Sequence, residues 1–186
     1  MSTLYWVRHA HTEWTPDENR PLSAKGSEDT NRVANTLSEY PISAIYSSPA
    51  LRAYQTIAPL AGRLGLSIHI EPALQERRLC KGVFEDFFKA VEVTWRNPLF
   101  AYPGGESNLT AQKRGSVLVQ RLLEKHPAQH IVLSTHGNLM ALVLQIFDPS
   151  VDFMFWKSLT MPDVYKLNLS QSGKRLMQRV WQEVDA

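Results

Sequence analysis

Two short apolar runs are the strongest features in the pattern of hydrophobic and polar positions along the chain. Residues 4–7 (Leu-Tyr-Trp-Val) and residues 131–134 (Ile-Val-Leu-Ser) each end abruptly in polar residues. Short apolar runs with polar boundaries predict buried strands. Residues 42–46 and 67–70 predict two further strands, the second of which ends at Pro72.

Segments with helical spacing of apolar residues lie between these strands. The predicted helices are a segment from Ser23 to before Pro41, a segment from Ser48-Pro49 to Gly62 or Gly65, a segment over 107–125 that Pro127 stops, and a segment over 139–147. Ser23 belongs to the residue types preferred at helix N-caps. Serine followed by proline, as in Ser48-Pro49, is a typical order at a helix start.

The order of these elements predicts the fold class. Strands that alternate with helices are typical of α/β proteins with a largely parallel sheet. Residues 164–169 and 175–181 predict an antiparallel hairpin at one edge, with its turn at 171–173. We expect a single domain over residues 1–186, with a short aromatic flap at about 77–102.

Composition and charge narrow the function classes. Of 186 residues, 44% are hydrophobic, which is ample material for a core. Twenty Lys and Arg residues against eighteen Asp and Glu residues give a net charge of only +2, so nucleic acid and anionic membranes are not expected partners. Cys80 is the only cysteine, and the N-terminal residues do not resemble a signal peptide, so we expect a cytoplasmic protein.

Four side chains with suitable chemistry follow the predicted strands or begin the predicted helices. His9 and His136 each follow a buried strand, and neighbouring parallel strands would bring both to one crevice. His136-Gly137 also opens a helix, where free N–H groups bind anions. Arg8 and Arg52 add positive charge. This set predicts a site for an anion with several oxygens, such as a phosphate monoester.

Five motifs occur along the chain in a characteristic order. They are Arg8-His9-Ala10 with Leu22-Ser23 and Gly26, the run from Ser47 to Thr56, Leu74-Gln75-Glu76, the run from Pro103 to Ser107, and the run from Ser134 to Gly137. Together they resemble the histidine phosphatase superfamily, the phosphoglycerate mutase-like group, in its phosphatase branch. The resemblance implies a three-layer α/β/α sandwich and a phosphatase that acts on small phosphate esters.

The resemblance also implies roles for individual residues. His9 is expected to be the nucleophile that forms a phosphohistidine, and Glu76 to serve as the acid and then the base. Arg8, Arg52 and His136 are expected to hold the phosphoryl oxygens. Neither a metal ion nor another cofactor is implied.

Five further residues are expected to bind substrate. Thr12 matches the family pattern and is expected to touch phosphate, whereas Thr15 stands where many members carry a phosphate-binding asparagine. Arg77 and Arg78 are either a solvated pair or a site for a substrate carboxylate. Gly137 contributes the helix start.

Several alternatives stay open at the level of the sequence. His11 replaces a frequent acidic or amide residue and is either a pocket-rim residue or a substrate contact. Glu106 either favours a helix start or braces the active-site arginines. A mutase, a zinc hydrolase built on His9, His11 and His136, and a non-catalytic phospho-ligand module are the competing functions. A homodimer is also open. The short segment between Glu76 and the Pro103 turn favours the phosphatase over the mutase.

Overall fold

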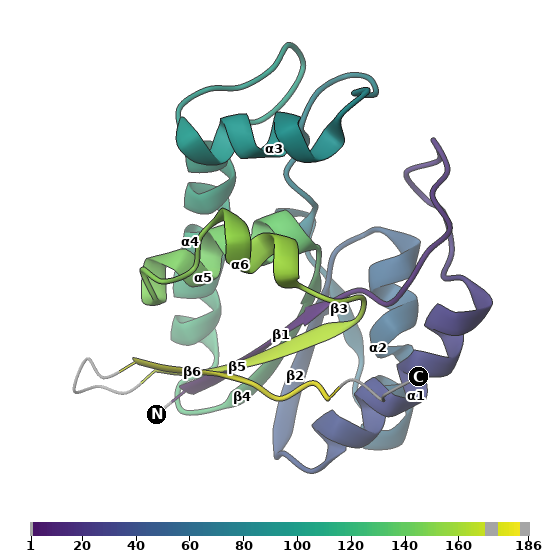
Figure 1. The fold of residues 1–186 in the computed structure, drawn as a ribbon. Coiled ribbons are helices and arrows are strands. Elements are labelled where there is room, and N and C mark those ends of the chain that lie inside the picture. The colour runs from purple at the N-terminus through teal and green to yellow at the C-terminus, as the bar shows by residue number, and fades with distance from the viewer. Residues whose placement is uncertain (1, 170–174, 183–186) are drawn as a thin grey trace.

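A six-stranded sheet forms the centre of the molecule. The computed structural model describes residues 2–169 and 175–182 (Figure 1). The strands are β1 (Ser2–Arg8), β2 (Ile42–Ser47), β3 (Ile68–Ile70), β4 (His130–Thr135), β5 (Asp163–Leu169) and β6 (Arg175–Arg179). Their order in the sheet is β3-β2-β4-β1-β5-β6.

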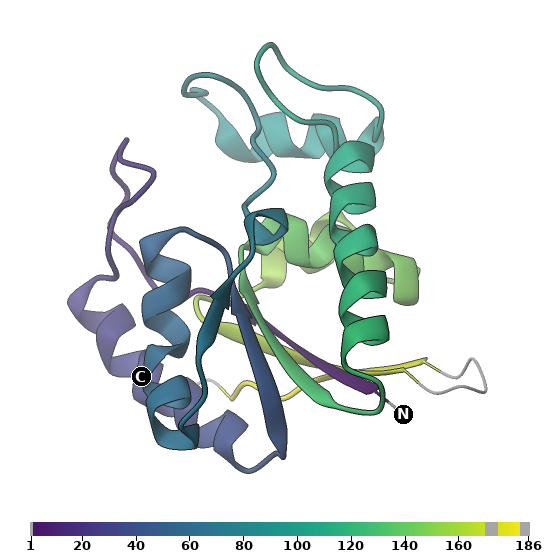
Figure 2. The ribbon, with the colours of Figure 1, turned by 180° about the vertical axis from the view of Figure 1, so that it is seen from behind.

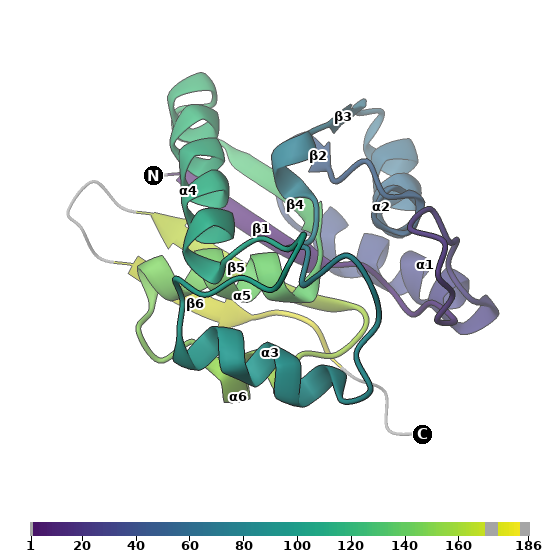
Figure 3. The same ribbon diagram turned by 90° about the horizontal axis from the view of Figure 1, so that it is seen from above.

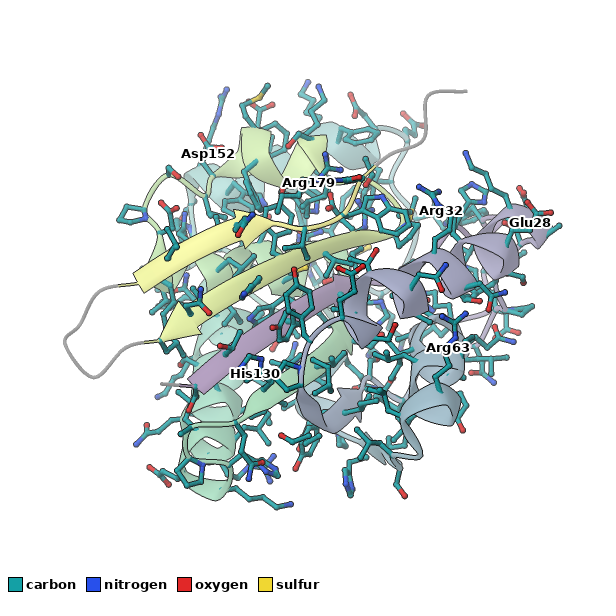
Figure 4. All side chains as sticks on the ribbon, turned by 90° about the horizontal axis from the view of Figure 1, so that it is seen from below. Glu28, Arg32, Arg63, His130, Asp152 and Arg179 are labelled. Carbon is teal, nitrogen blue, oxygen red and sulfur yellow. The ribbon has the colours of Figure 1, made fainter. Side chains whose placement is uncertain are left out.

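The strand directions confirm the predicted sheet. β1 and β2 both pair in parallel with β4, and β3 pairs in parallel with β2. β5 runs antiparallel to both β1 and β6. β5 and β6 lie along one edge of the sheet (Figure 4). The turn predicted at 171–173 falls outside the described residues.

Helices cover both faces of the sheet (Figures 1 and 3). The helices are α1 (Ala24–Ser38), α2 (Leu51–Leu64), α3 (Phe87–Arg96), α4 (Asn108–Lys125), α5 (Gly137–Phe147) and α6 (Phe153–Ser158), with a 3₁₀ turn η1 (Pro72–Leu74). Tyr5 and Val7 pack with α1 and α2, whereas Leu4 and Trp6 belong to the core under α4 and α5. This alternation follows the two-residue period of a strand and produces the expected three layers.

The capping residues predicted from the sequence mark the helix ends, except at the start of α2. The Ser23 side chain caps α1 by accepting from the Gly26 N–H, and Gly65 ends α2 with φ of 64°. The predicted start of the second helix at Ser48-Pro49 is wrong, because α2 begins at Leu51 and has no side-chain cap. The hydroxyl of Ser48 instead contacts His136.

Two helices were not expected from the sequence. α3 lies within the segment 77–102, across the top of α4 (Figure 2). Asp86 caps it through the Lys89 N–H, and the Asn108 amide links it to α4 by donating to the Thr94 carbonyl at 3.1 Å. The short helix α6 is capped by Asp152. In the described ranges, no helix combines the length and apolar character needed to cross a membrane.

Candidate active site

The two histidines meet at the carboxyl ends of β1 and β4. These strands are parallel neighbours, which is the condition under which the sequence places both histidines in one crevice, and Arg8 is paired to Thr135. His9 and His136 follow directly, and their ring centroids lie 5.1 Å apart. The sheet topology therefore brings together two residues that lie far apart in the sequence.

The hydrogen bonds of His9 show which of its ring nitrogens keeps a lone pair. The side chain is buried, and Nδ1 lies 2.8 Å from the Ala10 carbonyl oxygen. A carbonyl can only accept, so Nδ1 carries the proton and Nε2 keeps its lone pair. Arg52 Nε donates to Nε2 at 3.2 Å. The nitrogen that keeps its lone pair thus faces a guanidinium group.

Arg52 lies between the two imidazole rings. Its Nη2 donates to Nδ1 of His136 at 3.2 Å, and its Nη1 donates to the Glu18 carbonyl at 2.8 Å. Because Nδ1 of His136 accepts, Nε2 carries the proton and donates to the Ser48 hydroxyl at 2.8 Å. Arg52, which can only donate, therefore fixes the tautomer of His136, and Ser48 accepts its Nε2 proton, a contact that the sequence pattern did not indicate.

The surroundings keep both rings neutral. Burial lowers the pKa of His9 from 6.5 to about 3, and the charges of Arg52 and Arg8 act in the same direction. Burial also lowers the pKa of His136 well below its usual value. Burial, with the charge of Arg20, lowers the pKa of Arg52 to about 10, which still leaves it cationic at neutral pH. A neutral imidazole among cations is suited to attack an anionic phosphoryl group.

This burial predicts a pH dependence of folding stability. Between about pH 6.5 and pH 3, the unfolded chain protonates His9 while the folded chain does not. Stability should therefore fall as pH is lowered, by at most about 1.4 kcal/mol per pH unit for each such histidine. Urea unfolding between pH 7 and pH 5 measures how the free energy of unfolding changes with pH. This change should be smaller in His9→Asn than in the wild type. Equal slopes would contradict a neutral, buried His9.

Arg8 is held by the chain that precedes β5. Its Nη1 donates to the carbonyls of Leu159 at 2.7 Å and Thr160 at 3.4 Å. Its buried Nε has no hydrogen-bond partner within the described part of the chain. Gly137, the first residue of α5, lies so close that an added Cβ would be 3.1 Å from this nitrogen. A side chain at position 137 would therefore crowd Arg8.

The edge hairpin supports this arrangement. The buried carboxylate of Asp163 accepts from the Thr160 N–H at 3.0 Å and from Arg179 Nε at 2.8 Å. Arg179 lies on β6 at the sheet edge (Figure 4). The hairpin thereby fixes the two carbonyls that orient Arg8.

A cavity of about 700 Å³ opens beside the histidines. The lining residues that matter for the chemistry are Arg20, Ser48, Arg52, Glu76, Arg77 and His136. His9 is not part of the lining, because the Arg52 guanidinium lies over its Nε2. A phosphate dianion entering the cavity would attract the Arg52 donors more strongly than the neutral rings do.

Glu76 lies in the cavity wall and is tied to the start of α5. Its carboxylate accepts from the N–H groups of Asn138 at 3.0 Å, Leu139 at 2.9 Å and Arg77 at 2.8 Å. The segment after β3 therefore delivers a carboxylate to the same helix start as His136. This places a carboxylate in the wall of the cavity that His136 also lines.

The two arginines after Glu76 have different environments. Arg77 is buried, and its Nη2 donates to the Asn138 side chain at 3.3 Å. Its Nε and Nη1 make no hydrogen bond to any residue described by the structure. Arg78 is exposed, and its guanidinium lies 3.7 Å from the carboxylate of Glu18, which is also exposed. Arg77 is therefore a second buried cation of the cavity besides Arg52, and Arg78 is an exposed one.

The loop before α1 contributes a cation that the sequence analysis did not single out. Arg20 lines the cavity and donates to the Thr12 hydroxyl at 3.3 Å and the Thr15 carbonyl at 3.5 Å. Its charge disfavours the protonated forms of both active-site histidines. Thr12 and Thr15 themselves are outside the lining, and Thr15 is exposed. No spacing rule could indicate Arg20, because it lies in an irregular loop.

The remaining candidates, His11 and Glu106, lie apart from the histidine pair. Nδ1 of His11 contacts the Ser23 hydroxyl at 2.8 Å, and the ring is not in the cavity lining. Glu106 forms an ion pair with Arg114. In residues 2–169 and 175–182, no group of three His, Cys, Asp or Glu side chains is arranged to hold a metal ion. The geometry therefore gives the zinc-site hypothesis no support.

Comparison with known proteins gives a family match over nearly the whole chain. The sequence model of the histidine phosphatase superfamily (branch 1) matches residues 4–182. A probable phosphoglycerate mutase of Escherichia fergusonii is 30% identical over 74% of this chain and 70% of its own length. Phosphoserine phosphatase 1 of Hydrogenobacter thermophilus is 28% identical over 73% of this chain and 71% of its own.

A solved structure shows the same fold. A mycobacterial glucosyl-3-phosphoglycerate phosphatase in complex with inorganic phosphate superposes with a TM-score of 0.76 at 22% identity, covering 95% of this chain and 94% of its own. The strand order, the paired histidines at the ends of β1 and β4, and the family match agree. The chain therefore belongs to the histidine phosphatase superfamily, branch 1.

Proposed function

We propose that this protein is a phosphatase that hydrolyses phosphate monoesters through a phosphohistidine on His9, without a metal ion. The observation that carries the proposal is the tautomer of His9. Its Nδ1 proton is committed to the Ala10 carbonyl, which leaves the Nε2 lone pair directed at Arg52 beside the cavity. Phosphatases among the relatives and structural neighbours support the same reaction class.

The proposed reaction has two steps. First, Nε2 of His9 attacks phosphorus and the bond to the ester oxygen breaks, while Glu76 gives a proton to that leaving oxygen. Second, water attacks the phosphohistidine, Glu76 takes the proton, and the phosphorus–nitrogen bond breaks to release inorganic phosphate. Such a donor must reach the leaving oxygen within hydrogen-bond distance. The position of Glu76 in the cavity wall is consistent with that requirement.

Positive charge takes the part that a metal ion has in other phosphatases. Arg52 and the unpartnered Nε of Arg8 would donate hydrogen bonds to the phosphoryl oxygens beside His136, and Arg20 adds a further cation at the cavity. Phosphoryl transfer depends chiefly on positioning and on stabilising the charge that develops. Thr12, bonded to Arg20, would position that cation.

The substrate proposed here carries a second anionic group close to its phosphate ester. Arg77 supports this, because two of its buried nitrogens lack partners among the described residues while it lines the cavity. Leaving a buried cationic donor unsatisfied is costly, and a carboxylate would satisfy it. The exposed Arg78 could meet a longer substrate at the rim.

The setting of the reaction follows from the composition. Near-balanced charge and a single cysteine favour a cytoplasmic enzyme acting on small phosphorylated metabolites, with no role for nucleic acid or membrane. A homodimer is compatible with this proposal, and gel filtration with light scattering would test it.

Purified protein in chelator should release inorganic phosphate from several monoesters and interconvert 2- and 3-phosphoglycerate only slowly. The physical reason is that a mutase must shield its phosphoenzyme from water, whereas only a short segment separates Glu76 from the Pro103 turn here. Coupled assays of both reactions, with and without bisphosphoglycerate, measure the ratio.

Three outcomes would contradict the proposal in different ways. Mutase turnover well above phosphate release would identify a mutase. Activity that chelation removes and zinc restores would identify a metal enzyme. Binding of phosphate without turnover of an aryl phosphate would identify a non-catalytic module.

A further inference from the structure

Arg114 on α4 connects two segments of the cavity wall. Its Nε and Nη2 donate to the two carboxylate oxygens of Glu106 at 3.0 and 2.8 Å. Its Nη1 donates to the carbonyls of Ala73 at 2.7 Å and Gln75 at 3.1 Å. One guanidinium therefore joins the turn that opens α4 to the two carbonyls just before Glu76.

Glu106 extends this connection to the other side of Glu76. Its backbone N–H donates to the Arg78 carbonyl at 2.8 Å. Gly105 permits the approach, because an added Cβ would lie only 2.2 Å from the Leu79 carbonyl oxygen. The chain that carries Glu76 is thus held on both sides, through Gln75 before it and Arg78 after it.

The ion pair between Arg114 and Glu106 is more rigid than an ordinary surface pair. It is bidentate, and the two side chains are only 26% and 20% exposed. Exposed pairs contribute little because solvent screens them and both side chains stay mobile. A forked, largely shielded pair fixes geometry, and both residues line the cavity that contains Glu76.

We propose that Arg114, held by Glu106, is a positioning residue for Glu76, fixing the backbone on either side of the proton donor. This inference rests on the proposed acid role of Glu76. Four donor interactions of Arg114 go to the protein's own oxygens, so it acts through Glu76 rather than on the phosphoryl group. Small displacements of a catalytic group cost large factors in rate.

The test compares a good and a poor leaving group. Arg114→Gln should lower kcat/KM for β-glycerophosphate roughly tenfold more than for p-nitrophenyl phosphate, because nitrophenolate leaves without a proton. Glu76→Gln should show the same selective loss. The double variant that combines Arg114→Gln with Glu76→Gln should be no slower than Glu76→Gln alone, since the effects of coupled residues do not add. If Arg114→Gln folds poorly, Arg114→Lys replaces it in the test, because lysine keeps the charge and loses the two-pronged contact to Glu106.

Arg121→Gln is the matched control. Arg121 is two turns further along α4 and pairs with Glu71, which caps η1 through the Ala73 N–H. Its loss should leave the leaving-group preference unchanged. Equal losses on both substrates for the Arg114 variants, additivity in the double variant, or a selective loss in Arg121→Gln would overturn the inference. Absence of leaving-group dependence in Glu76→Gln would overturn both the inference and the proposed acid role.

Discussion

Replacing His9 with alanine should lower kcat/KM for an aryl phosphate by roughly 10⁴-fold or more, the scale on which loss of a covalent nucleophile acts. The arginines around the site would still bind phosphate, but the lone pair on Nδ1 of His136, which also faces Arg52, is not expected to replace that on Nε2 of His9. Steady-state kinetics with p-nitrophenyl phosphate measures the effect. Near-normal turnover would refute His9 as the nucleophile.

His11→Ala is the matched control for this variant. The same residue type lies two positions along the chain, bonded to Ser23 at the start of α1 and outside the cavity lining. Its removal should change kcat/KM only slightly. A large loss in this variant with little loss at His9 would mean that the reaction uses a different histidine.

Arg52→Ala should lower kcat by roughly 10² to 10³, as expected when a donor to the developing charge is lost. The Arg52 side chain donates hydrogen bonds to both His9 and His136, so its guanidinium is placed to follow the phosphoryl group during transfer. Arg52→Lys should recover part of the rate, because it restores the charge without the planar fork. Single-turnover kinetics separates this effect from substrate binding.

The control for Arg52 lies on the same helix. Arg63, in the last turn of α2, is exposed and bonds to Asn31 and Asn35 of α1. Arg63→Ala should leave kcat unchanged. A loss at Arg52 confined to KM would show that the residue binds substrate without stabilising the transition state, and this result would contradict its proposed role.

The sequence was most informative where a reactive side chain directly follows a buried strand. The apolar runs of β1 and β4 are continuous because both strands are covered on two faces, and His9 and His136 follow them without a gap. The fold class and the shared crevice of the two histidines could therefore be predicted.

Other residues escaped prediction because their partners are distant in the sequence or because they lie in an irregular loop. Ser48 has the signature of a helix cap, yet its hydroxyl contacts His136, 88 positions away. Arg20 lies in an irregular loop, and Arg114 lies on a helix face with no local sign that it contacts Gln75. α3 was missed because the aromatic residues of its segment were interpreted as packing in an irregular flap, although Ala90, Val91 and Thr94 form a buried face on the helix.

The phosphohistidine itself is the central claim, and trapping it is the most direct test. Labelled p-nitrophenyl phosphate should be mixed rapidly with the protein and quenched in alkali, because a phosphohistidine survives base and is lost in acid. The account predicts a labelled, acid-labile adduct on the peptide that contains His9, and none in His9→Ala. An acid-stable adduct, an adduct on another residue, or full turnover with no adduct at any quench time would contradict it.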